Sequence, residues 1–381
     1  MSGDGRSRNP GLDLARVLAA MMVVVCHATA LYPPLFGLPS PVPLLLGGYF
    51  GVELFFVLSG FLIGRILLRI AAGDATLRGW FTFMLRRWLR TLPLYYLWLA
   101  VMALALPPGA DLLGHLLSFG TMTQNLAWPM PADEWFNQTW SLTIEEWFYL
   151  LFSAALLGAA ALARSPRVSW AVIGAFIVVP LAARLLSPDP ADFEKQMYHV
   201  ALLRLDAIAY GVALARLHAG GARLFRHPVV AGLLGVAVIA AFWIQDSAGV
   251  WLHVTGIQFL NLQLVATSLG YCLLLVGLQH LRWRRGPVVK LITLGSQISY
   301  GLYMMHLAVI ERVLQFGAVH RWSAWLEVAV SLPLVFLLPY LSWRFFEAPI
   351  LAMRPGLRRR PAAVAHMDAA ALPIETIATP R

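Results

Sequence analysis

Apolar and polar positions alternate along this chain in long blocks. Apolar runs of about 17–25 residues, the length that crosses a bilayer as an α-helix, follow one another with short polar connections between them. The pattern predicts ten membrane-spanning helices, at residues 12–31, 46–69, 91–107, 145–163, 168–186, 199–218, 228–245, 259–280, 289–310 and 322–343.

The composition supports the same class. Of 381 residues, 59% are hydrophobic and 13% charged, with a mean hydropathy of +0.70. We therefore expect an all-α fold, a polytopic transmembrane helical bundle. Three regions follow: a cytoplasmic N-terminus at 1–11, a membrane domain at 12–350, and a disordered, basic cytoplasmic tail at 351–381. No internal repeat or appended soluble domain is expected.

The distribution of the charges, rather than the net charge of +10, predicts the topology. Most of the 29 basic residues fall at the N-terminus, at 65–90, 164–167, 216–227 and 282–290, and after Arg344. The opposite connections carry most of the acids, namely Asp111, Asp133, Glu134, Asp189, Asp192, Glu194, Asp246 and Glu311. By the positive-inside rule both termini are cytoplasmic, in a cell inner membrane. A spread of charge over inner loops also argues against nucleic-acid binding.

Two segments admit other interpretations. Arg6, Arg8 and the small residues at 28–30 resemble a cleavable signal peptide, but the first run is long enough to span and has a hairpin partner. If the apolar residues 112–128 were a span, every later basic loop would lie on the outer side, against the positive-inside rule. We therefore expect 108–144 to be an outer, partly re-entrant or interfacial segment.

Ionisable side chains inside the spans are the candidate functional groups, because each is costly in a bilayer. Arg16 and His27 share one face of the first helix, separated by about three turns and roughly 16 Å. The topology predicts two imidazoles and three carboxylates at one level near the outer side: His27, Glu53, Glu145, Glu146 and His306. An imidazole beside a carboxylate suits general-base catalysis.

Arginines gather at the other level. Arg16 faces the same cytoplasmic side as Arg86, Arg87 and Arg90, and clustered guanidinium groups suit phosphate through bidentate hydrogen bonds. The simpler alternatives are that these arginines only set topology and that the histidines only pack. Taken together, the two levels suggest a phosphate-bearing donor from the cytoplasm and a hydroxyl or amine acceptor near the outer face.

No metal site is expected. Cys26 and Cys272 lie inside apolar runs without the spacing of metal ligands, so both are expected to be packing residues.

Several motifs occur together in order. They are Leu12–Arg16 with ten residues before His27, Gly51–Ile63 (GVELFFVLSGFLI), Arg87–Tyr96 (RWLRTLPLYY), Trp140–Tyr149 (WSLTIEEWFY), Arg204–Asp206 with Gly211, Ser299–His306 (SYGLYMMH) and Glu347–Pro349. Over roughly residues 10–350 the chain resembles the acyltransferase type 3 family of integral membrane acyltransferases.

The resemblance implies transfer of an acyl group, commonly acetyl, from cytoplasmic acyl-CoA to a hydroxyl of a carbohydrate or glycolipid acceptor, with acyl-CoA as a substrate and no bound cofactor. It implies a catalytic His27 with Arg16 as its motif partner. It also implies donor handling by Arg87 and Arg90, extended here to Arg86. The remaining motif residues are assigned as catalytic (Glu145, Glu146, His306) or substrate-binding (Glu53, Trp140, Asp206). The chain departs from the family at Glu53, where many members have Asp, and at Cys26, where an aromatic residue is frequent.

The mechanism expected from these residues has acyl-CoA phosphates on Arg86, Arg87 and Arg90, with Arg16 guiding the pantetheine arm toward His27. His27 would deprotonate the acceptor with Glu145 or Glu146 orienting it, or would form an acyl-histidine. The main rival is a transporter or flippase, which predicts two related halves with broken helices that the sequence does not show. A receptor or scaffold is the weaker rival.

Overall fold

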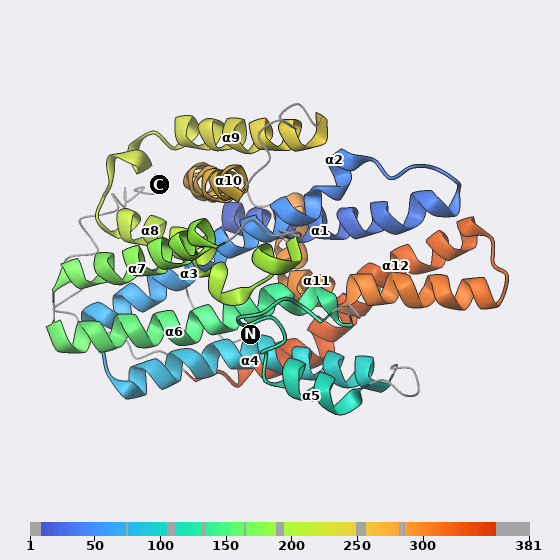
Figure 1. Cartoon of the computed structure of the whole chain (residues 1–381), viewed down its shortest axis with the longest axis horizontal. Helices are drawn as coiled ribbons and strands as arrows, with labels where there is room; N and C mark the ends of the chain where they lie inside the picture. Colours follow the sequence, from blue (N-terminus) through green and yellow to red (C-terminus); the bar gives the residue numbers. More distant parts are fainter. Residues whose placement is uncertain are drawn as a thin grey trace, which may run out of the picture.

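The computed structural model describes residues 9–73, 75–104, 111–131, 135–163, 165–187, 194–248, 257–281, 283 and 286–355, and these form helices without strands. Eight helices are long and apolar enough to cross a membrane: α1 (Pro10–Leu35), α3 (Gly47–Gly73), α6 (Trp140–Ala163), α7 (Pro166–Leu186), α9 (Pro228–Ala248), α10 (Ile257–Gln279), α11 (Pro287–Val319) and α12 (Ala324–Ser342). The predicted polytopic helical bundle is confirmed. Figure 1 shows α1, α3, α4, α6 and α12 running along the long axis of the molecule.

The other two predicted spans are helices of different extent. α4 (Leu77–Leu104) begins fourteen residues before the predicted position 91, so its first half carries the arginines. A hydropathy pattern does not predict this start, because the charged arginines lower the mean hydropathy of the first half of the helix. α8 (Leu205–Ala219) begins six residues later than predicted. The backbone N–H groups of Ala201 and Leu202 donate instead to the carbonyl groups of Asn125 and Leu126, at 2.8 and 3.0 Å.

The segment expected to be re-entrant holds a nine-residue helix, α5 (Leu112–Gly120), which is too short to span. It lies beside α4 (Figure 1), where Tyr95 donates a hydrogen bond to the Phe119 carbonyl at 2.7 Å. After α5 the chain turns into the bundle, and Gln124 and Asn125 are buried. The 3₁₀ turn η1 (Asn137–Thr139) then leads into α6.

Contacts between connections divide the bundle into two ends. At one end Asn9 donates to the Gln279 carbonyl at 2.8 Å, and the rings of Phe225 and His280 lie 6.3 Å apart. At the other end the rings of Phe36, directly after α1, and of Trp325, in the first turn of α12, lie 4.6 Å apart. Three of the predicted inner segments, the N-terminus, 216–227 and 282–290, thus meet at one end, which we call the basic end. That this end faces the cytoplasm remains a prediction from the charges.

The packing brings the motif helices together. α1 packs against α3 and α11, α3 packs against α8, α6 and α10, and α11 packs against α12. After α12 a π-helical turn, η5 (Trp343–Glu347), and the short α13 (Ala348–Ala352) continue the chain past the predicted tail boundary at 351. α13 packs against α4. Residues 356–381 of the predicted tail, and the predicted loop charges Asp133, Glu134, Asp189, Asp192, Arg282, Arg284 and Arg285, lie outside the described residues.

Candidate active site

The two histidines predicted at one level touch each other. His27 of α1 and His306 of α11 bring Nδ1 and Nε2 to 2.8 Å, and their ring centroids lie 4.9 Å apart. His306 is fully buried, whereas His27 is partly exposed. The pair therefore lies at the seam between α1 and α11, with His27 as its accessible member.

Hydrogen bonding fixes the protons on a neutral pair. His306 Nδ1 lies 2.9 Å from the Leu302 carbonyl oxygen, which only accepts, so this nitrogen carries the proton. His306 Nε2 is then an acceptor and receives the Nδ1 proton of His27. The consequence is that Nε2 of His27 keeps its lone pair, the state that a general base requires.

The glutamates predicted beside the histidines lie elsewhere. Tyr149, one turn along α6, donates its hydroxyl proton to Glu145 Oε2 at 2.8 Å and accepts from Arg87 Nη2 at 3.2 Å. The Arg87 guanidinium also lies 4.7 Å above the Tyr149 ring, and Ser59 bonds to the same phenol oxygen at 2.5 Å. Glu145 therefore belongs to the arginine level.

Glu146 points to a different neighbour on α4. Its Oε1 accepts a hydrogen bond from Thr91 at 2.6 Å, in a buried position. The predicted common level fails for both glutamates because η1 and the start of α6 already lie beside α11, where Ser141 meets Tyr303 at 2.6 Å. Among the described residues no carboxylate hydrogen bonds to His27.

Arg16 is held between two helices. Its Nη1 lies 3.2 Å from Asp13 Oδ1 and donates to Ser296 Oγ at 2.8 Å, while Ser296 donates to the same Asp13 oxygen at 2.6 Å. The Asp13 carboxylate compensates the charge, and Ser296 fixes the direction of the guanidinium toward α11.

Two adjoining cavities lie between Arg16 and the arginines of α4, and neither His27 nor His306 lines them. The inner cavity, about 260 Å³, is lined by Arg16, Arg90, Ser296, Gln297, Tyr300, Trp343, Glu347, Ala348 and Leu351. The second, about 100 Å³, reaches deeper and is lined by residues that include Arg16, Ser59, Arg87, Arg90, Glu145, Ser299, Tyr300 and Tyr303. Arg16, Arg90 and Tyr300 line both. The deeper cavity ends at Tyr303, whose ring centroid lies 6.3 Å from that of His306.

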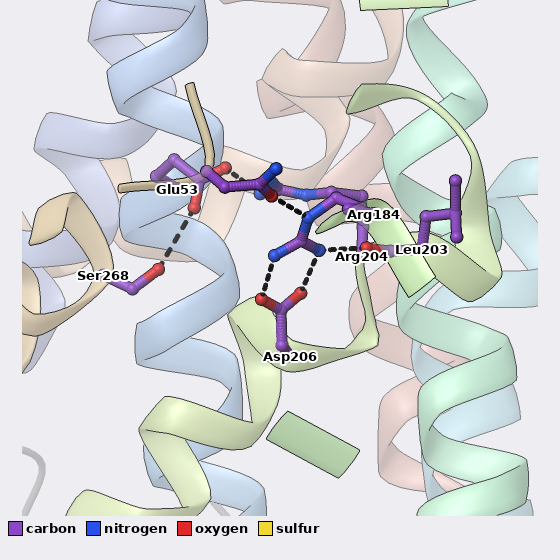
Figure 2. A network of polar contacts seen from close by, with 7 residues as sticks. Glu53, Arg184, Leu203, Arg204, Asp206 and Ser268 are labelled. Carbon is purple, nitrogen blue, oxygen red and sulfur yellow. Dashed lines mark hydrogen bonds and ion pairs between the residues drawn. The ribbon is translucent and has the colours of Figure 1, made fainter. Parts of the chain in front are cut away.

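Glu53 and Asp206, predicted to bind substrate, lie outside both cavities. Figure 2 shows them in a buried network in which Arg204 pairs with Glu53 and Arg184 forms two hydrogen bonds to Asp206, at 2.9 and 2.6 Å. Ser268 reaches Glu53 from α10 at 3.4 Å. All four charged side chains are almost completely buried. The network joins α3, α7, α8 and the turn before α8.

Trp140 also lies outside the cavities. It is 8% exposed and packs its ring against His199, with centroids 4.3 Å apart. Arg86 lies on α4 and donates to the Pro355 carbonyl beyond α13.

Some residues that line the cavities, or that contact a lining residue as Tyr149 contacts Arg87 and Glu145, were not singled out from the sequence. Tyr149, Tyr300, Tyr303 and Ser59 stand inside the quoted motifs, and Tyr149 follows Glu145 by one helical turn, a spacing that was available as a signal. Arg184 is an arginine inside a predicted span, which by itself marks a paired or functional group. Among the described residues no three His, Cys, Asp or Glu side chains gather as a metal site.

Comparison with known proteins agrees with the motif order. The acyltransferase domain family, acyltransferase type 3, matches residues 9–344. The chain belongs to this family. A relative from Bacillus subtilis (strain 168), named "Putative peptidoglycan O-acetyltransferase YrhL", is 26% identical over 388 aligned positions, which cover 90% of the chain. The match spans about half of that relative, 54% of its length. No solved structure matches the chain.

Family membership gives the arrangement its context. In this type 3 acyltransferase chain, the Arg16–His27 motif runs from the cavity wall to the histidine pair along one helix. The arginine motif of α4 lines the same cavities from the opposite side.

Proposed function

We propose that this chain is an acyl-CoA-dependent O-acyltransferase of the cell inner membrane, which moves an acetyl group to a hydroxyl of a carbohydrate or glycolipid acceptor. The observation that carries the proposal is the pair of adjoining cavities. They lead from the basic end, past Arg16 and Arg90, to Tyr303 beside the histidine pair.

The donor matches this path in charge and in polarity. Arginines at the basic end suit the phosphates of CoA, because guanidinium groups bind phosphate with paired hydrogen bonds. Beyond them the deeper cavity is lined mainly by apolar and aromatic side chains such as Phe55 and Leu142, which suit an uncharged pantetheine arm. The acyl carbon would then meet the acceptor near His27.

His27 would act as the general base. Its Nε2 takes the proton of the acceptor hydroxyl, and the oxygen attacks the thioester carbonyl carbon. The carbon–sulfur bond breaks, and the CoA thiolate leaves with the proton that the His27 imidazolium returns. His306 keeps its own Nδ1 proton throughout and holds His27 in the reactive tautomer.

The acceptor class rests on the relative, whose name refers to peptidoglycan. In this proposal the donor enters from the basic end, and the glycan acceptor reaches His27 from the other side. This division of the two substrates also distinguishes an acyltransferase from the transporter alternative, which would carry one substrate through.

The test is transfer of label from [acetyl-¹⁴C]acetyl-CoA into endogenous glycan or glycolipid of membranes that contain this chain. We expect label with the native chain and none with His27→Ala, since loss of a general base lowers a rate by about 10²–10⁴-fold. His227→Ala, at the C-cap of the 3₁₀ turn η4 (Arg223–Arg226) and away from the cavities, is the matched control and should keep the native rate. Equal labelling in all membranes, including His27→Ala, would remove His27 from the mechanism.

A further inference from the structure

The basic end gathers four guanidinium groups from two elements. Arg86, Arg87 and Arg90 occupy successive turns of α4, and Arg354 follows α13, which packs against α4. Arg86 donates to the carbonyl of Pro355, directly after Arg354. Arg354 lies within electrostatic reach of all three α4 arginines.

Arg354 is not neutralised by an acid among the described residues. Its Nε and Nη2 are buried without a hydrogen-bond partner, and Arg87 Nε is in the same state. Glu347, the carboxylate nearest in sequence, accepts a hydrogen bond from Ser342 at 3.1 Å. Partial burial, and then the charges of Arg90, Arg87 and Arg86, lower the pKa of Arg354 to about 9. At neutral pH the group still carries its charge. Glu145 lies within electrostatic reach of Arg87 and Arg90, and Glu347 within reach of Arg90, whereas no described carboxylate acts on Arg354 in the same way.

Such a cluster is stabilised by an anion, because unpaired guanidinium nitrogens and mutual repulsion both disappear when a phosphate binds between them. The cluster adjoins the inner cavity. Leu351, one turn before Arg354, lines that cavity together with Arg90.

We propose that Arg354, together with Arg86, binds the 3′-phosphate of the nucleotide of the acyl-CoA donor. This inference rests on the proposed function and adds a subsite to it. The thioester must reach His27, about three helical turns beyond Arg16. The nucleotide, at the opposite end of the donor, is left at the basic end. The pyrophosphate, which adjoins the pantetheine arm, faces Arg87 and Arg90, which line the deeper cavity. The 3′-phosphate, carried on the ribose, faces the outermost pair.

The experiment compares two donors, acetyl-CoA and acetyl-dephospho-CoA, which lacks only the 3′-phosphate. For the native chain we expect KM to be about tenfold higher with acetyl-dephospho-CoA, the loss of one charge-assisted phosphate contact. Arg354→Ala should raise KM for acetyl-CoA by about the same factor, leave KM for acetyl-dephospho-CoA near the native value, and keep kcat.

The matched control is Arg226→Ala, an exposed arginine of the short 3₁₀ turn η4 (Arg223–Arg226), which should keep the native preference between donors. Arg354→Lys keeps a charge without the planar fork and should retain part of the preference. It also keeps the inference testable should Arg354→Ala fold poorly.

Two results would overturn the inference. One is an Arg354→Ala protein that still distinguishes the donors as the native chain does. The other is an equal loss of affinity for both donors, which would place Arg354 on the pyrophosphate or in the fold. Either result leaves acetyl transfer by the native chain intact. Absence of transfer by the native chain would instead count against the proposed function itself.

Discussion

His27 and His306 form a directional pair in which one imidazole sets the tautomer of the other. The Leu302 carbonyl binds the Nδ1 proton of His306, and His306 Nε2 then accepts the Nδ1 proton of His27 across 2.8 Å. A chain of this kind leaves one free lone pair, on His27 Nε2. In the proposed mechanism His306 would take the place of the carboxylate that orients the catalytic histidine in many hydrolases.

Substitutions at His306 should therefore act on kcat. His306→Ala removes the acceptor, so His27 samples the wrong tautomer, and we expect kcat to fall by about 10²–10⁴-fold with the donor KM unchanged. His306→Gln restores an acceptor oxygen near the position of Nε2 and should recover most of the rate. Steady-state acetyl transfer at varied acetyl-CoA concentration separates kcat from KM. Equal loss in both variants would mean that His306 serves another purpose.

Tyr149 should affect the donor instead. Tyr149→Phe removes the oxygen that binds Arg87, Ser59 and Glu145, and so frees the Arg87 guanidinium from its fixed direction. With one or two hydrogen bonds of roughly 1 kcal/mol lost, we expect the acetyl-CoA KM to rise about fivefold to tenfold. Tyr96→Phe, a partly exposed phenol of the same helix α4 as Arg87, is the control and should keep the native KM. A fall in kcat alone would contradict this assignment.

Hydropathy and charge predict most of the fold, because a bilayer requires long apolar helices and places basic residues on one side. They do not predict the depth in the membrane at which a helix starts. Glu145 and Glu146 were expected beside His27, yet the inward turn after α5 lets α6 begin beside α11, and both glutamates lie at the arginine level. Only tertiary contacts, such as those of Asn125, determine that turn.

The candidate site was predictable in part. The motif residues Arg16, Arg87 and Arg90 line one common cavity, as their predicted shared level implied. The contact between His27 and His306 depends on how α1 and α11 are aligned, which spacing along the chain does not determine. Arg354 lies beyond every motif. The partners of Glu53 lie 151 and 215 positions away from it in the sequence. Sequence spacing says nothing about contacts of that kind. The catalytic and binding roles of all these residues remain predictions.

Two glycines set how closely α3 and α8 approach. A Cβ atom on Gly60 would lie 1.9 Å from the Ile208 carbonyl oxygen, and one on Gly211 would lie 2.1 Å from that of Val57. Such small residues let transmembrane backbones touch. Gly60→Ala must push the two helices apart, so we expect the free energy of unfolding to fall by about 1–3 kcal/mol or more. Thermal unfolding in detergent is the measurement.

Gly158→Ala is the matched control for this contact. Gly158 lies in α6, and a Cβ atom there would meet nothing within 4 Å. Alanine has the higher helix propensity, so the melting temperature should stay the same or rise slightly. An equal fall for both variants would show that helix packing at Gly60 is not the cause.

The buried network around Glu53 allows the two assignments of that residue to be separated (Figure 2). As part of the fold, Glu53 compensates Arg204 inside the bundle, and Glu53→Gln leaves a buried guanidinium without its carboxylate, which costs about 3–5 kcal/mol. As a substrate ligand, it would instead change KM for the acceptor without changing stability. The cavities do not include Glu53, and we therefore expect a large drop in melting temperature, with KM values of the remaining folded protein near native.

The matched control is Ser268→Ala, which removes one long contact of 3.4 Å to the same carboxylate and should lower the free energy of unfolding by less than about 1 kcal/mol. A stable Glu53→Gln protein with a raised acceptor KM would assign Glu53 to the substrate, because a buried guanidinium cannot lose the carboxylate with which it forms an ion pair without destabilising the fold.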